Sequence, residues 1–330
     1  MNSVKNKTIV VFKNRALGDA IISLGAIQYL KKMLPDYHLI FGVPDWVYPL
    51  FSELNTAADE IIPINLKNIN GWLDTYTQIK SRNPQMIIEL FQSGRGKKFG
   101  EFYQLINQCI YFGNNHHLDD GTYKKANIQR DIDGISGHLN LNSDSFLNFC
   151  PSVTLKSEPP KKNEIIFGIV ATRETKLWPI EYFHQLAVLI QKNFPEYKII
   201  IPVSKNSLDQ NLKQNFLRIG ILPNVEFIEK PLAELPKAIA GAQLYIGNDT
   251  GLKHLSIALD IKSLSFFGPE PPIEWHPYDQ KVHPYFYLEP LECRTRSAHF
   301  CGLSTCDSMI CLNGFKAESV FEQVKSLLGE

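Results

Sequence analysis

The stretch Tyr245–His254, YIGNDTGLKH, places an apolar strand directly before a run of small and polar residues and the start of a helix. In an open α/β sheet, such a turn is either a plain connection or a seat for an anion. The first amides of a helix have no partners within it, so Thr250, Gly251 and Leu252 would present theirs together. Gly251 leaves room for a phosphate, Thr250 adds a hydroxyl, and His254 follows one turn later. The alternative is that a polar residue before the helix only caps it.

The bulk composition describes a globular protein. A chain of 330 residues favours two domains of roughly 150 residues each. Its 34 basic and 34 acidic residues balance, so no global charge favours nucleic acid or an anionic membrane. No apolar run approaches the roughly 20 residues needed to span a bilayer, and no secretory signal is present at the N-terminus. We therefore expect a cytoplasmic protein without a transmembrane segment and without a nucleic-acid partner.

Short apolar runs alternate with helical patterns in the first half, which indicates βαβ units and a parallel sheet. A helix is predicted over Asp19–Met33, where apolar residues recur at helical spacing. The predicted strands are Ile9–Lys13, His38–Val43, Glu60–Pro63, Met86–Phe91 and Cys109–Phe112.

The segment Lys156–Asn163, KSEPPKKN, has two prolines, three lysines and no apolar residue, and it predicts an interdomain linker. It separates a domain over 1–155 from a second α/β domain over 163–312, and residues 313–330 hold an amphipathic helix. The alternating elements predicted after the linker are strands Ile165–Val170, Tyr197–Val203, Val225–Ile228, Gln243–Gly247 and Ser263–Phe267, and helices Ile180–Lys192, Ser207–Ile219, Ala233–Ala240 and Gly251–Leu259. Ligands of such sheets bind outside the carboxyl ends of the strands, so we expect both domains to turn these loops toward one cleft.

Two further loops at strand ends carry candidate chemistry. Asp19 follows the first strand, where it is either a helix cap or a general base. In Ala171–Pro179, ATRETKLWP, Thr172 offers a hydroxyl and Lys176 a cation; the alternative is a polar surface loop. Together with the loop at Thr250, this segment suits a pyrophosphate. Neither a P-loop nor a G-x-G-x-x-G fingerprint is present, which disfavours a nicotinamide cofactor.

Several stretches together resemble glycosyltransferase family 9, the heptosyltransferases of lipopolysaccharide core synthesis. The two signature stretches are RALGDAIISLGAIQYL over Arg15–Leu30 and GNDTGLKHL over Gly247–Leu255. Further agreement lies in T-x-x-x-K-x-W-P at Thr172–Pro179, F-F-G-P-x-x-P-x-x-W-x-P-Y at Phe266–Tyr278 and C-x-x-x-x-C-L at Cys306–Leu312. The matches follow the family's order over nearly the whole chain.

This resemblance implies a GT-B fold, with two Rossmann-like domains whose parallel sheets face a central cleft. It implies that the N-terminal domain binds the acceptor, that the C-terminal domain binds a nucleotide-diphosphate-sugar donor, usually ADP-heptose, and that the last helix packs back on the N-terminal domain. Transfer would invert the anomeric centre without a catalytic metal. The acceptor would be a lipopolysaccharide core or related glycan, so the enzyme would work in the cytoplasm or peripherally at the inner face of the membrane.

The resemblance also assigns roles to single residues. Asp19 takes the position of the catalytic base, and Asp249 that of the acidic residue near the donor sugar. The positions that match donor-binding residues around the phosphates are Thr172, Lys176, Thr250, Gly251, Leu252 and His254. One departure concerns the strand ending at Ile201, after which relatives have a glycine-rich turn and an acidic residue for the ribose. Here Asp209 is the candidate, and adenosine specificity is open.

The segment Ser93–Lys98, SGRGKK, follows a predicted strand of the first domain. Arg95, Lys97 and Lys98 would bind phosphates of a glycolipid acceptor, or they belong to a solvated turn. Family members place acceptor contacts in this domain, which favours the first interpretation.

Cys293, Cys301, Cys306 and Cys311 lie close together near the C-terminus. Their C-x7-C-x4-C-x4-C spacing is not that of the common zinc knuckle, yet four clustered thiols fit a structural Zn or Fe ion. Reduced cysteines and a disulfide are the alternatives. Relatives that glycosylate proteins carry a four-cysteine metal finger in a comparable place, so a protein Ser/Thr acceptor is a second hypothesis for the function. A non-catalytic sugar-nucleotide-binding protein is the third.

Overall fold

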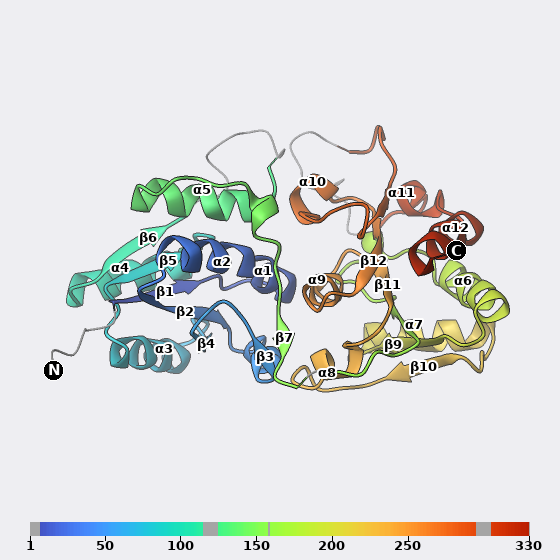
Figure 1. Ribbon diagram of the computed structural model, residues 1–330, viewed down its shortest axis with the longest axis horizontal. Coiled ribbons are helices and arrows are strands. Elements are labelled where there is room, and N and C mark those ends of the chain that lie inside the picture. Colours follow the sequence, from blue (N-terminus) through green and yellow to red (C-terminus); the bar gives the residue numbers. More distant parts are fainter. Residues whose placement is uncertain (1–6, 115–124, 158, 295–304, 330) are drawn as a thin grey trace. The chain divides into compact units, whose positions relative to one another are not determined.

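The computed structural model describes residues 7–114, 125–157, 159–294 and 305–329. The chain forms two compact units, Met1–Lys156 and Ser157–Glu330, which divide within the predicted linker. Each unit is an α/β layer structure (Figure 1). None of the described helices is long and apolar enough to span a bilayer.

The described part of the first unit holds a five-stranded parallel sheet in the order β4-β2-β1-β5-β6. Numbered along the chain within the unit, this order is 3-2-1-4-5, which is Rossmann-type doubly wound topology. The strands are β1 (Lys7–Phe12), β2 (Tyr37–Pro44), β4 (Glu60–Ile64), β5 (Met86–Glu89) and β6 (Ile110–Gly113).

Helices cover both faces of this sheet. They are α1 (Leu17–Ile22), α2 (Leu24–Met33), α3 (Ile69–Ser81), α4 (Gly94–Ile106) and α5 (Asn127–Leu139), with the short helices η1 (Tyr48–Phe51) and η2 (Phe146–Asn148). α2 packs with α5 (Figure 1). Aromatic residues of α3 and α4 share a core with β1, β2, β4 and β5. The short strands β3 (Leu54–Asn55) and β7 (Thr154–Leu155) pair antiparallel beside the linker.

The second unit holds a six-stranded parallel sheet in the order β10-β9-β8-β11-β12-β13 in its described part, which is 3-2-1-4-5-6 within the unit. The strands are β8 (Glu164–Gly168), β9 (Lys198–Pro202), β10 (Val225–Ile228), β11 (Leu244–Asn248), β12 (Lys262–Phe267) and β13 (Tyr285–Tyr287). The helices are η3 (Glu174–Lys176), α6 (Ile180–Asn193), α7 (Ser207–Ile219), α8 (Leu235–Ile239), α9 (Gly251–Ala258), α10 (Pro272–Trp275), α11 (Ile310–Asn313) and α12 (Ala317–Leu328).

The predicted strands are confirmed within one or two residues at most ends, because strands buried on both faces read as continuous apolar runs. The single helix predicted over Asp19–Met33 is wrong in detail. It divides at Ser23, whose hydroxyl donates to the Asp19 carbonyl 2.8 Å away, a back-bond that bends helices.

The segment Ser93–Lys98, for which a solvated turn was one interpretation, forms the cap and first turn of α4. Its glycines have low helix propensity, so the sequence does not indicate a helix here, but Gly96 is required by packing. A Cβ at Gly96 would lie 1.9 Å from the Glu89 carboxylate. Tertiary packing therefore overrides helix propensity in this segment.

The last helix, α12, completes the core of the second unit. Val320, Phe321 and Val324 belong to the same buried cluster as residues of α6 and the sheet. The rings of Phe321 and Phe194 lie 6.0 Å apart. The apolar face of α12 is therefore buried within the second unit.

Replacing Phe321 with alanine is expected to destabilise the second unit by about 3–5 kcal/mol, because it opens a cavity between α12 and α6. Hydrogen exchange should show faster exchange in α6 and unchanged exchange in α3. Val188→Ala, at a position of α6 that is 42% exposed, is the control and should change little. Loss of protection in α3 instead of α6 would contradict this assignment.

Candidate functional site

The site of the second unit lies where the strand order reverses between β8 and β11. Ligands of doubly wound sheets bind at such a point, outside the carboxyl ends of the strands. The two strands approach closely there, since a Cβ at Gly247 would lie 2.6 Å from the Gly168 carbonyl oxygen. The loop after β8 carries Lys176, and the loop after β11 carries Asp249 and Thr250.

A buried side chain fixes these two loops to each other. The amide oxygen of Asn248 accepts from the Trp178 backbone N–H at 2.9 Å, and its amide nitrogen donates to the Ile169 carbonyl at 2.9 Å. Trp178 is itself buried and stacks on Phe266, with ring centroids 4.1 Å apart. The backbone around both loops is therefore held on a rigid base.

Helix α9 begins at Gly251 as predicted, with Thr250 in extended conformation before it and no side-chain cap. The alternative that Thr250 caps the helix through its side chain is therefore wrong. The first bond of the helix runs from the His254 N–H to the Thr250 carbonyl, so the amides before His254 have no acceptor within the helix. The buried Thr250 hydroxyl oxygen has no hydrogen-bond partner among the described residues. This helix start has the donors that an anion requires.

Asp249 lies between two lysines. Its Oδ1 accepts from the fully buried Lys253 ammonium, and its Oδ2 lies 3.6 Å from Lys176 Nζ. Lys253 also donates to the Trp275 carbonyl at 3.0 Å and lies over the Phe267 ring, 4.5 Å from the centroid. Lys253 was not predicted, and it fixes the carboxylate that the family pattern assigns to the donor sugar.

Glu270, in the loop after β12, is a second residue that the sequence analysis missed. Its carboxylate forms an ion pair with Arg173 and lies 3.2 Å from Lys176 Nζ. The cluster thus holds three cations, Arg173, Lys176 and Lys253, against two carboxylates. One net positive charge remains, which suits an anionic ligand.

The protonation states in this cluster follow from burial and charge. Burial alone would raise the pKa of Asp249, but Lys253 and Lys176 outweigh it and hold that pKa well below its usual value. Burial, reinforced by Lys253, lowers the pKa of His254 well below its usual value, so its ring is neutral at pH 7. His254 Nδ1 lies 2.6 Å from the Tyr278 hydroxyl, and Nε2 is 3.8 Å from Asp249 Oδ1.

The remaining donor candidates lie around this cluster. Thr172 is exposed in the loop after β8, and Leu252 is buried in the first turn of α9. Asp209, the candidate for the ribose, accepts from the Ser204 N–H through Oδ2, while its own N–H donates to the Asn206 side chain. The bond to Asn206 is the N-cap bond of α7, and the bond from Ser204 holds the preceding turn against the helix, which gives Asp209 a structural role in α7.

In the first unit, Asp19 follows the carboxyl end of β1, again beside the reversal of strand order, which lies between β1 and β5. It is not the helix cap, because that position belongs to Ala16 and Asp19 lies in the first turn of α1. Its side chain is 10% exposed, and Arg15 Nε is 3.5 Å from Oδ1. The Arg15 guanidinium stacks over Phe91 in the loop after β5, 4.0 Å from the ring centroid.

A buried ion pair supports the turn that carries Asp19. Lys13 Nζ lies 3.0 Å from the Asp131 carboxylate, and both side chains are almost fully buried. The Ser23 hydroxyl, which bonds the Asp19 carbonyl, lies 3.5 Å from the same carboxylate. The backbone that carries Asp19 is thus held by contacts among the end of β1, the end of α1 and α5.

The cations predicted for the acceptor, Arg95, Lys97 and Lys98, are all exposed on the first turns of α4. The helix start beneath them is already occupied by a carboxylate, since Glu89 accepts from the Ser93 N–H at 2.9 Å. The three cationic side chains are thus exposed, while the Ser93 and Gly96 N–H groups of the helix start are already bonded.

The cysteine cluster gains no support as a metal site. Cys293, Cys306 and Cys311 lie in the described residues, where no group of three or more metal-ligating side chains is found. Cys301 lies outside the described residues.

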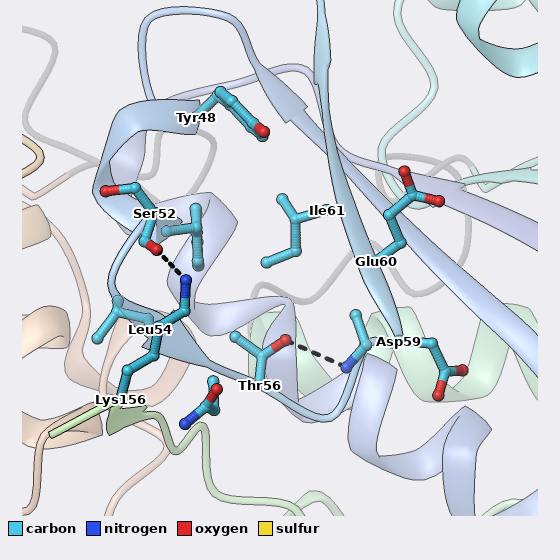
Figure 2. A pocket seen from close by; sticks show the side chains of 11 residues that line it. Tyr48, Ser52, Leu54, Thr56, Asp59, Glu60, Ile61 and Lys156 are labelled. Carbon is cyan, nitrogen blue, oxygen red and sulfur yellow. Dashed lines mark hydrogen bonds between the residues drawn. The ribbon is translucent and has the colours of Figure 1, made fainter.

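A pocket of about 280 Å³ lies elsewhere in the first unit, between η1, β3 and the start of β4 (Figure 2). Both acids that line it are already paired, Asp59 with Lys31 and Glu60 with Arg82. Lys156, at the end of this unit, closes one side through a bond to the Ser52 carbonyl. No predicted site residue lines this pocket, so we do not place the reaction there.

Comparison with known proteins finds relatives in one enzyme family. Residues 126–299 match the family model for glycosyltransferase family 9 (heptosyltransferase). The chain is 27% identical to lipooligosaccharide heptosyltransferase 2 of Campylobacter jejuni over 327 residues, 94% of this chain and 95% of that protein. A family 9 glycosyl transferase structure from Veillonella parvula superposes with a TM-score of 0.74 at 18% identity, over 98% of this chain and 97% of that one.

A structure of Escherichia coli heptosyltransferase WaaC with ADP-2-deoxy-2-fluoro heptose superposes with a TM-score of 0.68 at 15% identity, over 97% of this chain and 99% of that one. Two Rossmann-type units in one chain, shared with these structures, define the GT-B fold of glycosyltransferases. The chain belongs to glycosyltransferase family 9, the heptosyltransferase family, and is a glycosyltransferase enzyme.

Replacing Lys253 with methionine is expected to destabilise the second unit by about 3–5 kcal/mol at pH 7, because a buried carboxylate loses its main partner. The double variant Lys253→Met/Asp249→Asn should recover part of this loss. Urea unfolding of both variants, with the exposed Lys237→Met as control, measures the difference. If the double variant were less stable than Lys253→Met, the ion-pair assignment would be wrong.

The same carboxylate makes stability depend on pH. Because its pKa is lowered on folding, Asp249 contributes stability that is present above its unfolded-state pKa of about 3.9 and is lost as the pH falls below it. Wild type should therefore lose more stability than Asp249→Asn between pH 5 and 3 in the same unfolding experiment.

Proposed function

We propose that the enzyme transfers a heptose or related sugar from a nucleoside-diphosphate donor, ADP-heptose, to a hydroxyl of a lipopolysaccharide core or related glycan, with inversion and without a catalytic metal. The observation that carries this proposal is the anion site at the β8–β11 reversal in a family 9 chain. The names of the relatives, and the ADP-heptose analogue in the related structure, support the donor and the acceptor class.

The second unit would bind the donor. The amides at Thr250, Gly251 and Leu252, with the Thr250 hydroxyl and Lys176, would hold the diphosphate. Thr172 lies in the same loop as Lys176 and would add a hydroxyl from the rim. Neutral His254 would donate a hydrogen bond rather than a charge, and Asp249, ionised between its lysines, would face the sugar.

The first unit would bind the acceptor and supply the base. The acceptor oxygen forms a bond to the anomeric carbon as the bond from that carbon to the diphosphate oxygen breaks, and Asp19 takes the hydroxyl proton. A single displacement of this kind inverts the anomeric centre. Arg95, Lys97 and Lys98 would bind phosphates of a glycolipid acceptor at the inner membrane surface.

Electrostatics would then do the work that a metal does in other glycosyltransferases. The leaving nucleoside diphosphate gains negative charge as the bond breaks, and fixed N–H groups and Lys176 stabilise it where it develops. Asp249 would stabilise the positive charge that builds on the sugar ring, by analogy with glycosidases. Glu270 would keep Lys176 and Arg173 in place before the donor arrives.

Asp19→Asn should lower turnover by about 10²–10⁴-fold while ADP binding stays unchanged, because only proton removal is lost. Turnover is measured with ADP-heptose and a lipopolysaccharide core acceptor, and ADP affinity by calorimetry. Asp36→Asn, an exposed acid of the same unit, is the control. Turnover of Asp19→Asn near the wild-type rate would rule out the role as base.

Lys176→Met should weaken ADP binding by about 10–100-fold, the usual worth of a charged hydrogen bond. Lys192→Met, an exposed lysine of α6, should bind ADP as wild type does. Equal affinities of the two variants would refute the phosphate role. Separating lipid-linked from protein-linked product in the same assays, with labelled donor, distinguishes a glycolipid from a protein acceptor.

A further inference from the structure

Exposed apolar side chains gather along the seam between α3 and α4 of the first unit. In α4, Phe102 is 40% exposed, Leu105 83% and Ile106 49%. In α3, Ile69 is 70% exposed and Leu73 49%. Large apolar patches on a soluble protein mark interaction sites more often than single exposed residues do.

The two helices are in direct contact, so these side chains share one surface. The ring of Phe102 lies 4.8 Å from that of Trp72 and 6.2 Å from that of Tyr76. Helical spacing places Ile69 and Leu73 on the side of α3 that borders Tyr76, and so the side toward α4.

Basic residues accompany the apolar ones on the same sides of the helices. Lys80 lies one turn beyond Tyr76, with Nζ 5.5 Å from its ring centroid. Arg95 and Lys98 precede Phe102 by seven and four residues, which places them on its side of α4. Of the exposed acids on these helices, Asp74 lies on another side of α3 by the same spacing. Glu101 precedes Leu105 by four residues and borders the surface, where its charge is offset by Lys97, whose Nζ lies 3.7 Å from Glu101 Oε1.

We infer that this α3–α4 surface, formed by Ile69, Leu73, Lys80, Arg95, Lys98, Phe102, Leu105 and Ile106, docks the enzyme on an anionic lipid bilayer. Apolar side chains enter the boundary between headgroups and acyl chains, and the cations bind the lipid phosphates. The whole chain has no net charge, so this attraction is local. A second copy fits less well, because a self-complementary contact would bring the same cations together.

This inference deepens the proposed function only by naming the surface on which a glycolipid acceptor would be met, and its test needs neither donor nor acceptor. The full chain is sedimented with vesicles of phosphatidylcholine, with and without phosphatidylglycerol. Wild type should bind the anionic vesicles, and salt should weaken that binding. Leu105→Gln/Ile106→Gln should lower the bound fraction at least about fivefold, and Lys80→Glu by about the same factor.

Ile221→Gln is the matched control, because Ile221 in the second unit is as exposed as Leu105, at 83%. It should bind the vesicles as wild type does. Leu105→Gln/Ile106→Gln should also keep wild-type turnover on a delipidated acceptor, which separates this surface from the catalytic proposal.

Three outcomes would overturn the inference. They are unchanged vesicle binding by Leu105→Gln/Ile106→Gln, equal binding of wild type to neutral and anionic vesicles, and a change of oligomeric state in that variant by light scattering without a loss of binding. The last outcome would assign the surface to a second copy of the chain.

Discussion

The site depends on one buried amide. Asn248 is the last residue of β11, and its side chain bonds the chain that leaves β8 at the place where the order of strands reverses. Pairing of β8 with β11 brings the starts of the two loops together, and this link holds them in one arrangement. With it, a lysine from one loop and a helix start from the other stay within reach of the same anion, and no movement is needed to assemble them.

Charge compensation follows from this fixed geometry. Asp249 is buried, and it stays ionised because Lys253 is buried against it and Lys176 approaches from the opposite oxygen. Glu270 likewise forms ion pairs with Lys176 and Arg173. Both carboxylates of the cluster are therefore paired with cations, and one positive charge is left over.

The sequence predicted the fold well because buried parallel strands read as apolar runs, and strand ends locate the loops that bear Lys176 and Asp249. The sequence did not predict residues whose roles depend on contacts with parts of the chain that are distant in sequence. Gly96 and Gly100 of α4 make room for Glu89 and Tyr111, and nothing local to α4 reveals that. Glu270 lies in a proline-rich loop without a period. Lys253 was detectable, since it is a lysine four residues after Asp249 in a mainly apolar helix.

The position of α12 has a consequence for how the protein matures. The first unit is built from a continuous stretch of chain and can fold as soon as that stretch has left the ribosome. The second unit cannot complete its core until residues 317–328 have been synthesised. The indole N–H of Trp178 likewise has its acceptor, the Phe315 carbonyl, only after that late segment has been made. During translation the nascent chain would therefore carry one finished lobe and one with exposed apolar surface, so the second lobe is where chaperones would be needed.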